Sequence, residues 1–410
     1  MHSSTALLLF YLLDDLHTLY HKEWEGWAMK RLGWMIMAAA LLLSVLTLPA
    51  RAVELDIKGK SALLMDVATG TVLYEANAHE PLAPASVTKV MTMLLIMEAV
   101  DSGKIGWDDT VTASETAAAK GGSQIYLKVG ETMSVSDMVK SIAVSSANDC
   151  ACAMAEHLAG SESAFVDMMN AKAQELGMQD THFVNCTGLD DGVDADQHRT
   201  SAHDIAVMSR ELLKNHPDIK KFTTIWMDTV RNGTFGLSNT NKLVRFYSGA
   251  TGLKTGFTSG AGYCLSASAE REGMELIAVV MGSERSADRF AACKSMLDYG
   301  FANFSLICAE PEEQAQVPVK LGKAAAVTAE PGKDTQLLID KSQRGSVTTE
   351  MTLEESVTAP VSKGQRLGTL TVKAGEQVLT EVPLVAAEAV ERLSWGDLFV
   401  KIFKQVAMAK

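Results

Sequence analysis

One short segment, a serine and a lysine in front of a long apolar run, constrains this chain more than any other feature. The segment begins with Pro84 and leads directly into the largely apolar run 90–97, which predicts a buried helix that starts near the proline. Ser86 and Lys89 are three residues apart, so they share one face of that helix. The hydroxyl would lie in the first turn, where free backbone N–H groups and the helix dipole favour negative charge. The pair therefore has the form of an activated serine nucleophile with an amine as its base. Such a pair also arises by chance, but Ser86 is the only serine in the chain with lysine at this spacing.

Composition and charge exclude several classes of protein. The chain has 410 residues, of which 47% are hydrophobic and 21% are charged; this is typical of a globular protein with room for two domains. Its net charge of −13, without any lysine- or arginine-rich block, argues against nucleic acid as a partner. The six cysteines lack zinc-type spacing, and no histidine pair has the HExxH form, so we expect no metal ion and no cofactor.

The cysteines are expected to be mainly structural. Cys150 and Cys152 are two residues apart in a predicted helix, so their side chains point in different directions and a bond between them would be strained. We expect most of the six to be small buried hydrophobic residues. The sequence leaves their pairing open.

The N-terminal part predicts export. Residues 29–52 combine a basic start, an apolar stretch over 32–48 and an A-x-A pattern that ends at Ala52, as in a signal peptide cleaved after that alanine. Acidic residues within 1–28 do not fit in front of such a leader, so we interpret 1–28 as a mis-called N-terminal extension. An uncleaved anchor is the alternative, although about 17 apolar residues are marginal for a span. Export would place the mature protein at the outer face of the cytoplasmic membrane, in the cell-wall space.

Hairpins and helices alternate in the middle of the chain. One hairpin is expected at 62–67 and 71–74, and a second joins 263–269 to 276–281 through a charged turn. Helices are expected at 134–145, 149–159 and 202–213.

Two segments among these elements carry candidate chemistry. Ser146 and Asn148 lie in a polar insert between two predicted helices, where serine and asparagine also occur simply as caps. Lys254, Thr255 and Gly256 precede the second hairpin, so a cation, a hydroxyl and an unobstructed backbone could follow the edge of a cleft. A side chain at Gly256 would stop a substrate strand from approaching. The alternative is an ordinary strand start with a solvated lysine.

The pattern changes from about residue 306. Short alternating apolar runs separated by Gly, Pro and Lys predict a small all-β domain over 306–387. The last segment, 388–410, places Trp395, Phe399 and Phe403 on one helical stripe. It is too short and too charged to span a bilayer, so we expect it to lie on a membrane surface. Packing against the β domain is the alternative.

Three motifs occur in one order and once each: Ser86-x-x-Lys89, Ser146-x-Asn148 and Lys254-Thr255-Gly256. Together they resemble the penicillin-binding serine acyltransferases. Further similarity to the low-molecular-mass D-alanyl-D-alanine carboxypeptidases of serine peptidase family S11 lies in four segments: 181–185, 188–189, 239–242 and 252–265. The resemblance covers roughly 53–303. It implies an α/β (α+β) serine β-lactamase/transpeptidase-like domain, with an antiparallel sheet, a helical cluster and the reactive serine at their junction, followed by the small all-β domain.

This resemblance implies a mechanism. Ser86 would attack the carbonyl between the two terminal D-alanines of a peptidoglycan stem peptide and form an acyl-enzyme. Neutral Lys89 would be the base, so burial and a neighbouring cation such as Lys254 must depress its pKa from the free value of about 10.4. Ser146 would relay a proton to the leaving amine, and Asn148 would orient Lys89 and the substrate amide.

The same resemblance implies how the substrate is held. Backbone N–H groups of Ser86 and Phe257 would form the oxyanion hole, worth roughly 3 kcal/mol per donor. Lys254 and Thr255 would hold the terminal carboxylate. Arg289 stands where the family carries an arginine near this site, although a structural ion pair is an equally good interpretation. β-Lactam antibiotics would be covalent inhibitors.

Three other activities are open at this stage. A β-lactamase shares the motifs, and its deacylating E-x-x-x-N loop has a formal counterpart at Glu211 and Asn215. However, these two residues lie in a predicted helix far downstream of Asn148. A non-catalytic sensor of penicillin or wall peptides would keep the fold, but the motif residues are all intact. Endopeptidase or transpeptidase action depends on the shape of the cleft, which the sequence does not show.

Overall fold

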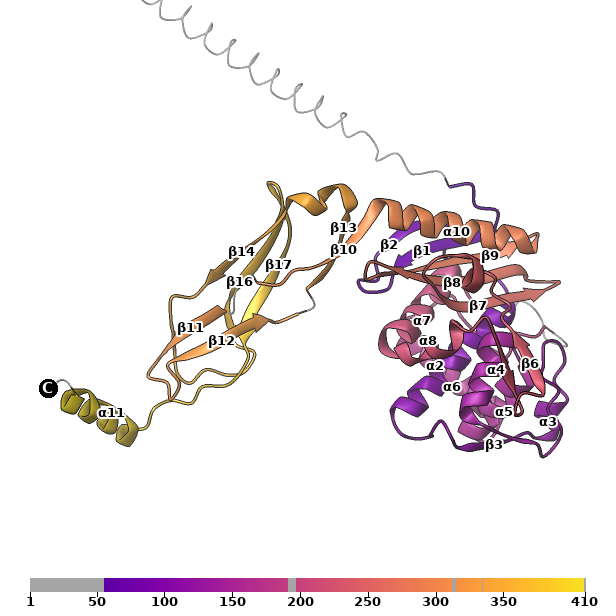
Figure 1. Cartoon of the computed structure of the whole chain (residues 1–410), viewed down its shortest axis with the longest axis horizontal. Coiled ribbons are helices and arrows are strands. Elements are labelled where there is room, and N and C mark those ends of the chain that lie inside the picture. Colours follow the sequence, from indigo (N-terminus) through magenta and orange to yellow (C-terminus); the bar gives the residue numbers. More distant parts are fainter. Residues whose placement is uncertain (1–54, 191–196, 312–314, 334, 409–410) are drawn as a thin grey trace, which may run out of the picture. The chain divides into compact units, whose positions relative to one another are not determined.

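The protein is described by a computed structural model over residues 55–190, 197–311, 315–333 and 335–408 (Figure 1). The predicted extension 1–28 and the leader 29–52 lie outside the described residues. None of the helices in the described ranges has the length and hydropathy that crossing a bilayer requires.

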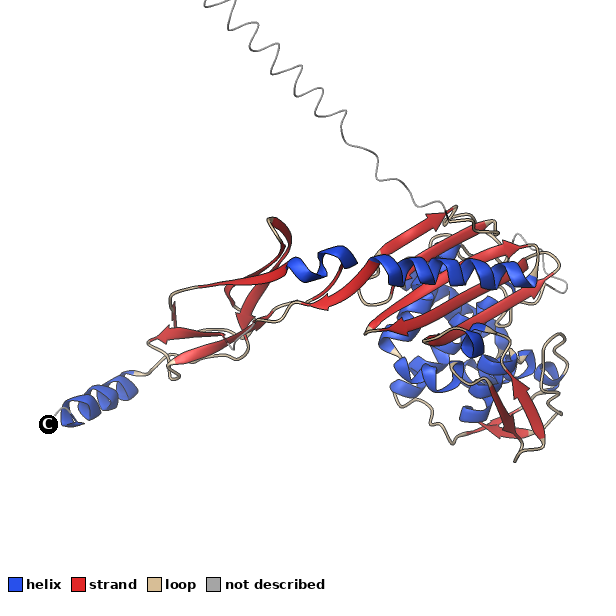
Figure 2. Cartoon of the chain, turned by 45° about the horizontal axis from the view of Figure 1, so that its top comes forward, coloured by secondary structure: helices blue, strands red, loops and turns tan. Residues whose placement is uncertain are grey.

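An antiparallel sheet forms the frame of the first part of the chain, with the strand order β2-β1-β9-β8-β7 in the described residues. The strands are β1 (Ser61–Asp66), β2 (Val72–Ala76), β7 (Ala250–Thr258), β8 (Gly262–Arg271) and β9 (Met274–Ser283). Helix α10 (Ser286–Asn303) packs on β8 and β9 from one face, and α7 (Ala202–Asn215) packs on β1 and β9 from the other (Figure 2). Because both faces are covered, β9 is buried along nearly its whole length, which explains its continuous apolar sequence. Both predicted hairpins, β1–β2 and β8–β9, are confirmed.

Helices surround the apolar run that follows Lys89. This run forms α2 (Lys89–Asp101), whose residues 89–96 are at most 5% exposed. It contacts α4 (Val135–Ser145), α5 (Asn148–Ala159), α6 (Glu162–Glu175) and α7. A helix enclosed in this way needs apolar residues on every face, so it shows no amphipathic stripe. The predicted buried helix is therefore confirmed, but it is preceded by a 3-10 turn, η1 (Ala85–Thr88), and Ser86 lies in that turn.

Shorter elements connect these parts. They are β3 (Thr110–Thr112), α3 (Glu115–Ala118), β4 (Thr132–Ser134), η2 (Pro217–Ile219), α8 (Lys220–Thr223), β5 (Met227–Val230), β6 (Phe235–Ser238) and α9 (Leu243–Phe246). All six cysteines are free, and five of them are buried while Cys308 is exposed. The expectation that most are buried hydrophobic residues is confirmed.

The C-terminal part is built from strands, as predicted. Its described residues contain a sheet with the order β14-β16-β17-β12-β11-β15, and β10 (Phe304–Cys308) pairs with β13 (Gln336–Asp340). The sheet strands are β11 (Ala315–Lys320), β12 (Ala326–Pro331), β14 (Val347–Leu353), β15 (Val357–Thr358), β16 (Arg366–Ala374) and β17 (Gln377–Ala386). A core of small and branched apolar residues, including Leu367, Val372 and Val382, lies within it. The last described element is the helix α11 (Trp395–Met408).

Candidate active site

The hydroxyl of Ser86 and the amine of Lys89 meet where η1 passes into α2. Lys89 Nζ lies 2.9 Å from Ser86 Oγ and 2.7 Å from the carbonyl oxygen of Thr187. Burial lowers the pKa of Lys89 from 10.5 to about 7, against smaller opposing effects of Cys186 and Asp149. A large fraction of this amine is therefore neutral near pH 7. A neutral amine has a lone pair that can accept the hydroxyl proton.

The backbone in front of Ser86 has an unusual conformation. Ala85 has a φ of +48°, a left-handed value that costs a residue with a side chain about 1–2 kcal/mol. Its carbonyl oxygen accepts a hydrogen bond of 2.8 Å from Thr88 Oγ1. Gly188 packs against the same carbonyl, and a Cβ at Gly188 would lie only 1.8 Å from that oxygen. Contacts from two sides thus hold the turn that carries Ser86.

Ser146 and Asn148 occupy the link between α4 and α5. Ser146 ends α4 with a φ of 62°, and Asn148 begins α5. Both side chains are buried, yet Ser146 Oγ and Asn148 Oδ1 have no hydrogen-bond partner within the described residues. Asn148 Nδ2 donates to the carbonyl of Gly121 at 2.8 Å, and no hydrogen bond of the described part joins Asn148 to Lys89. Because unpaired buried polar atoms are costly, these two oxygens are suited to a group that arrives with a ligand.

The motif Lys254-Thr255-Gly256 lies inside β7, an edge strand of the sheet, and not at a strand start. The side chain of Lys254 is buried and its Nζ donates to the Thr255 carbonyl at 2.7 Å. Thr255 Oγ1 donates to Thr240 Oγ1 at 2.7 Å. The sequence alternative of a solvated lysine is therefore wrong.

Gly256 brings this strand against the nucleophile turn. A Cβ at Gly256 would lie 2.7 Å from the carbonyl oxygen of Pro84 and 3.1 Å from the amide nitrogen of Ser86. Glycine is therefore required for the contact between β7 and η1 itself. This places the residue after it, Phe257, beside the nucleophile; its side chain is 53% exposed and stacks on Tyr263 with ring centroids 4.2 Å apart.

Arg289 reaches the same strand from α10. Its Nη1 donates to the carbonyls of Gly256 at 2.7 Å and Cys264 at 3.2 Å, while its Nε has no partner in the described residues. Burial lowers the pKa of Lys254 strongly, and repulsion from Lys89 and Arg289 lowers it further. Three basic side chains, Lys89, Lys254 and Arg289, thus share one buried region, where Lys89 and Arg289 disfavour the charged form of Lys254. An anion that entered it would relieve their repulsion.

Further contacts connect the Ser146–Asn148 motif to the nucleophile turn. A Cβ at Gly122 would lie 2.9 Å from Asn148 Nδ2 and 3.1 Å from Leu189 Cδ2. Leu189 follows Gly188, which packs on Ala85. Asn148 is thus linked to the nucleophile turn through Gly122 and the segment 188–189, while Gly256 contacts that turn directly.

Thr187 and Thr240 were not identified from the sequence as site residues. Thr187 acts through its backbone carbonyl and Thr240 through a hydroxyl that accepts from Thr255, and neither stands in a recognisable motif. The available signal was their position within or beside the similar segments 188–189 and 239–242.

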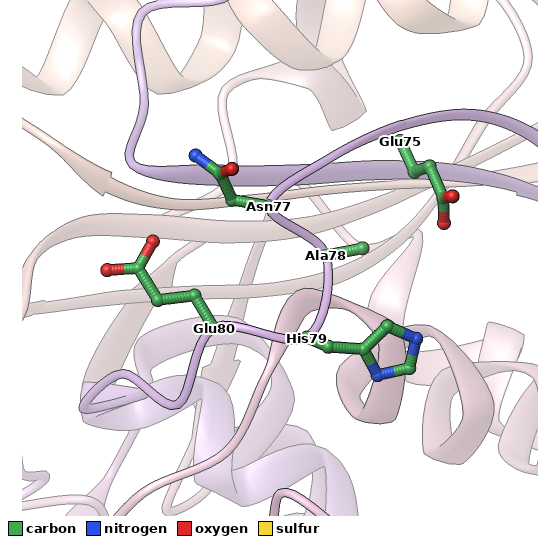
Figure 3. A pocket seen from close by; sticks show the side chains of 5 residues that line it. All are labelled: Glu75, Asn77, Ala78, His79 and Glu80. Carbon is green, nitrogen blue, oxygen red and sulfur yellow. The ribbon is translucent and has the colours of Figure 1, made fainter.

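A hollow of about 560 Å³ elsewhere on the chain is lined by Glu75, Asn77, Ala78, His79 and Glu80 (Figure 3). His79 Nδ1 lies 2.9 Å from Asp180 Oδ2, and its ring stacks on His203. None of the lining side chains has an unpaired buried polar atom. No cluster of His, Cys, Asp or Glu within the described ranges could hold a metal ion. The site around Ser86 is therefore the stronger candidate.

Comparisons with known proteins agree with this geometry. Residues 48–285 match the family model described as D-alanyl-D-alanine carboxypeptidase, and residues 306–392 match the C-terminal domain of penicillin-binding protein 5. The D-alanyl-D-alanine carboxypeptidase DacF of Bacillus subtilis is 44% identical over 348 residues, which cover 83% of this chain and 88% of the relative.

Solved structures give the same picture. Penicillin-binding protein 5 of Haemophilus influenzae superimposes with a TM-score of 0.71 and 30% identity, over 83% of this chain and 99% of that one. Penicillin-binding protein D2 of Listeria monocytogenes, solved in an ampicillin-bound form, reaches 0.53 and 32% identity over 60% of this chain and 99% of that one. Both the sheet with its helices and the all-β part are thus shared with known proteins. From its sequence, its fold and the arrangement of its three motifs, the chain belongs to the D-alanyl-D-alanine carboxypeptidases of peptidase family S11.

Proposed function

We propose that the chain removes the terminal D-alanine from peptidoglycan stem pentapeptides through an acyl-enzyme on Ser86. The observation that carries this proposal is the hydrogen bond between Ser86 Oγ and the buried amine of Lys89, whose pKa is lowered to about 7. A neutral amine at this position can activate the hydroxyl at the pH of the cell surface. No cofactor is needed for the reaction.

In acylation, Lys89 accepts the proton of Ser86 Oγ as this oxygen bonds to the carbonyl carbon of the penultimate D-alanine. The negative charge on the carbonyl oxygen would be stabilised by the backbone N–H groups of Ser86 and Phe257; the close approach of Gly256 to the Ser86 amide nitrogen supports this pairing. Ser146 then passes its proton to the leaving amine and takes a replacement from the protonated Lys89, so that the C–N bond breaks, D-alanine departs as an amine and Lys89 is neutral again. Ser146 Oγ has no hydrogen-bond partner in the described residues, which supports this role.

In deacylation, a water molecule attacks the ester carbonyl and gives up its proton to the amine of Lys89. The ester bond breaks, Ser86 Oγ regains a proton, and the shortened peptide leaves with a free carboxylate. Asn148 Oδ1 would accept a hydrogen bond from the substrate amide, and its burial without a partner among the described residues supports this role. Asn148 therefore positions substrate in this proposal, and its hydrogen bond to Gly121 holds its own side chain.

The terminal carboxylate of the substrate would bind where the cationic side chains gather. Lys254 and Arg289 supply the charge, and Thr255 supplies a hydroxyl at the edge of β7. A β-lactam carries a carboxylate and a strained amide in a similar arrangement, so it would acylate Ser86 and stay bound. The ampicillin-bound form of the Listeria relative supports this inhibition.

The rival activities have less support. Glu211 lies inside α7 and accepts a hydrogen bond from Asn215 at 2.7 Å, so the pair is a turn of one helix and not a deacylating loop. A non-catalytic sensor would not require the lowered pKa of Lys89.

The test of the proposed function is release of D-alanine from a pentapeptide by the purified protein, with Ser86→Ala as the control. Rapid turnover of nitrocefin would instead favour a β-lactamase, and no release at any pH would favour a sensor.

The same proposal extends to location. We place the mature protein outside the cytoplasmic membrane, with 29–52 as a cleaved leader, 53–303 as the catalytic domain, 306–387 as the β domain and 388–410 as a surface anchor. Trp395, Phe399 and Phe403 are 89%, 73% and 65% exposed. Exposed aromatic residues on one side of a terminal helix are suited to the interface of a bilayer. N-terminal sequencing of the exported protein tests the leader, and a mature chain that starts before Met29 would contradict it.

A further inference from the structure

A buried histidine lies behind the nucleophile turn and belongs to none of the three motifs. His198 is 5% exposed, and its Nε2 lies 2.8 Å from Thr88 Oγ1. Its Nδ1 lies 3.0 Å from the backbone nitrogen of Val184. Both ring nitrogens are therefore engaged, one by a residue between Ser86 and Lys89 and the other by a separate segment.

The hydrogen bonds define one tautomer of this ring. The N–H of Val184 can only donate, so Nδ1 must accept and carries no proton. A neutral imidazole then has its proton on Nε2, which donates to Thr88 Oγ1, and Thr88 Oγ1 donates in turn to the carbonyl of Ala85 at 2.8 Å. Burial, together with smaller contributions from His182 and Lys89, lowers the pKa of His198 to about 4, so the ring stays neutral at physiological pH.

This chain of hydrogen bonds ends on the strained residue in front of the nucleophile. Ala85 keeps a φ of +48°, a conformation that persists only when its surroundings fix it. Thr88 Oγ1 is the side-chain donor that holds the Ala85 carbonyl, and the His198 ring in turn fixes the direction of the Thr88 hydroxyl.

The other end of this series of hydrogen bonds, at Val184, lies close to the residue that holds Lys89. Val184 lies three residues before Thr187, whose carbonyl accepts from Lys89 Nζ at 2.7 Å. Asn185 Oδ1, next to Val184, accepts from the backbone nitrogens of Thr187 and Gly188. Through Val184, His198 therefore connects the segment that orients the base with the turn that presents the nucleophile.

We infer that His198, as the neutral tautomer protonated on Nε2, is a positioning residue that sets the relative geometry of Ser86 and Lys89 for acylation. The inference rests on the proposed function but deepens it. His198 touches neither the substrate nor the reacting atoms in this account. It acts through Thr88 on one side and through the Val184–Thr187 backbone on the other.

Three variants separate this role from simple packing. His198→Phe keeps a flat ring and removes both hydrogen bonds, His198→Gln keeps an acceptor and a donor on one amide, and Thr88→Val removes the hydroxyl at nearly constant shape. The readout is acylation by a fluorescent penicillin, resolved into the dissociation constant of the first complex and the first-order rate constant of the chemical step. Circular dichroism and thermal unfolding of the full chain are recorded alongside.

We expect His198→Phe and Thr88→Val each to lower the first-order rate constant by about 100-fold, as a small misplacement of reacting groups does. The dissociation constant should stay within about threefold, because no contact with the ligand is lost. His198→Gln should recover the rate to within about tenfold of wild type. The double variant His198→Phe/Thr88→Val should be no slower than the slower single variant, because both substitutions interrupt the same series of hydrogen bonds.

Several results would overturn the inference. These are a wild-type rate in His198→Phe or Thr88→Val, losses that multiply in the double variant, or a loss confined to the dissociation constant. If His198→Phe does not fold, Thr88→Val and His198→Gln decide the question, and a wild-type rate in Thr88→Val contradicts the inference. Failure of the wild type to release D-alanine would instead count against the proposed function, because acylation is measured separately.

Discussion

Lys89 Nζ lies 2.9 Å from Ser86 Oγ, and the lysine that provides this nitrogen is 0% exposed. The distance is that of an ordinary hydrogen bond, so burial is what distinguishes the pair from a solvated contact. Burial lowers the pKa of Lys89 to about 7. Loss of one proton near neutral pH then converts the nitrogen from a pure hydrogen-bond donor into an acceptor. In the proposed mechanism, acylation of Ser86 depends on that proton.

Acylation should therefore depend on pH in one direction. We expect the rate constant for acylation by a fluorescent penicillin to rise as pH increases through about 7 and then to level off, because only the neutral amine of Lys89 can accept the Ser86 proton. The measurement is the single-turnover rate from about pH 5 to about pH 9. A rate that is flat across this range, or that falls as pH rises, would show that Lys89 is not the base. Lys89→Ala should abolish acylation at every pH.

Removal of the buried amine should also change stability in a pH-dependent way. The folded-state pKa of Lys89 is about 7 and the ordinary value is 10.5, so between these pH values the unfolded chain binds more protons and the folded state gains stability as pH rises. Below the folded-state pKa, the full cost of a buried charge is present. Lys89→Met should therefore be more stable than wild type by on the order of 1–3 kcal/mol near pH 6, and the difference should shrink toward pH 10. Urea unfolding at both pH values checks this, with Lys294→Met on the exposed face of α10 as the matched control; an equal difference at both pH values would contradict it.

Much of the fold and of the candidate site could be predicted because it depends on local patterns. The apolar run after Lys89 has no polar face, and only an enclosed helix such as α2 accommodates such a sequence. Short apolar runs on either side of the turn 68–70 and of the charged turn 270–273 predicted the β1–β2 and β8–β9 hairpins. The predicted depression of the Lys89 pKa by burial is present, but Lys254 does not contribute to it; the effect runs the other way, and Lys89 lowers the pKa of Lys254.

The rest of the site depends on contacts between distant segments, which no local pattern reports. Thr187 serves Lys89 through a backbone carbonyl that any residue could supply. The left-handed conformation of Ala85 gives no sequence signal, because alanine rarely adopts it. The reason for glycine at position 256 is the proximity of Pro84, about 170 residues earlier, which becomes visible only when β7 and η1 are placed together.

Lys254 should act mainly in binding. Lys254→Ala removes a buried amine, which a bound carboxylate would favour in its charged form, from the region proposed to hold the terminal carboxylate. We therefore expect KM for a pentapeptide to rise by about 10–100-fold with a smaller change in the acylation rate constant. Lys294→Ala, an exposed lysine on α10, is the control that removes a charge outside the site. A substrate analogue with a C-terminal amide should discriminate poorly between wild type and Lys254→Ala. Equal losses of binding and chemistry, or equal losses with the acid and the amide, would assign Lys254 a different role.

Gly256 should tolerate no side chain. A Cβ at this position would lie 2.7 Å from the carbonyl oxygen of Pro84, and because this neighbour is backbone, the nucleophile turn itself must shift. We expect Gly256→Ala to slow acylation by about 100-fold or more. Gly236→Ala is the matched control, since Gly236 also lies in a strand and has nothing within 4 Å of its virtual Cβ. A Gly256→Ala protein that acylates at the wild-type rate would mean that β7 and η1 are not held in register by this contact.

The terminal helix should govern membrane attachment without affecting catalysis. Trp395, Phe399, Val400 and Phe403 are between 52% and 89% exposed, so α11 offers apolar area that a bilayer interface can cover. Deletion of 395–410 preserves the backbone hydrogen bond from Leu393 to Leu321 and should release the protein from lipid vesicles while D-alanine release stays within about twofold of the full chain. The double variant Trp395→Glu/Phe399→Glu keeps the helix but makes two of its apolar residues charged, and it should also fail to sediment with vesicles. Sedimentation of the truncated protein with vesicles would place the attachment elsewhere, and a loss of turnover on truncation would show that α11 supports the catalytic domain instead.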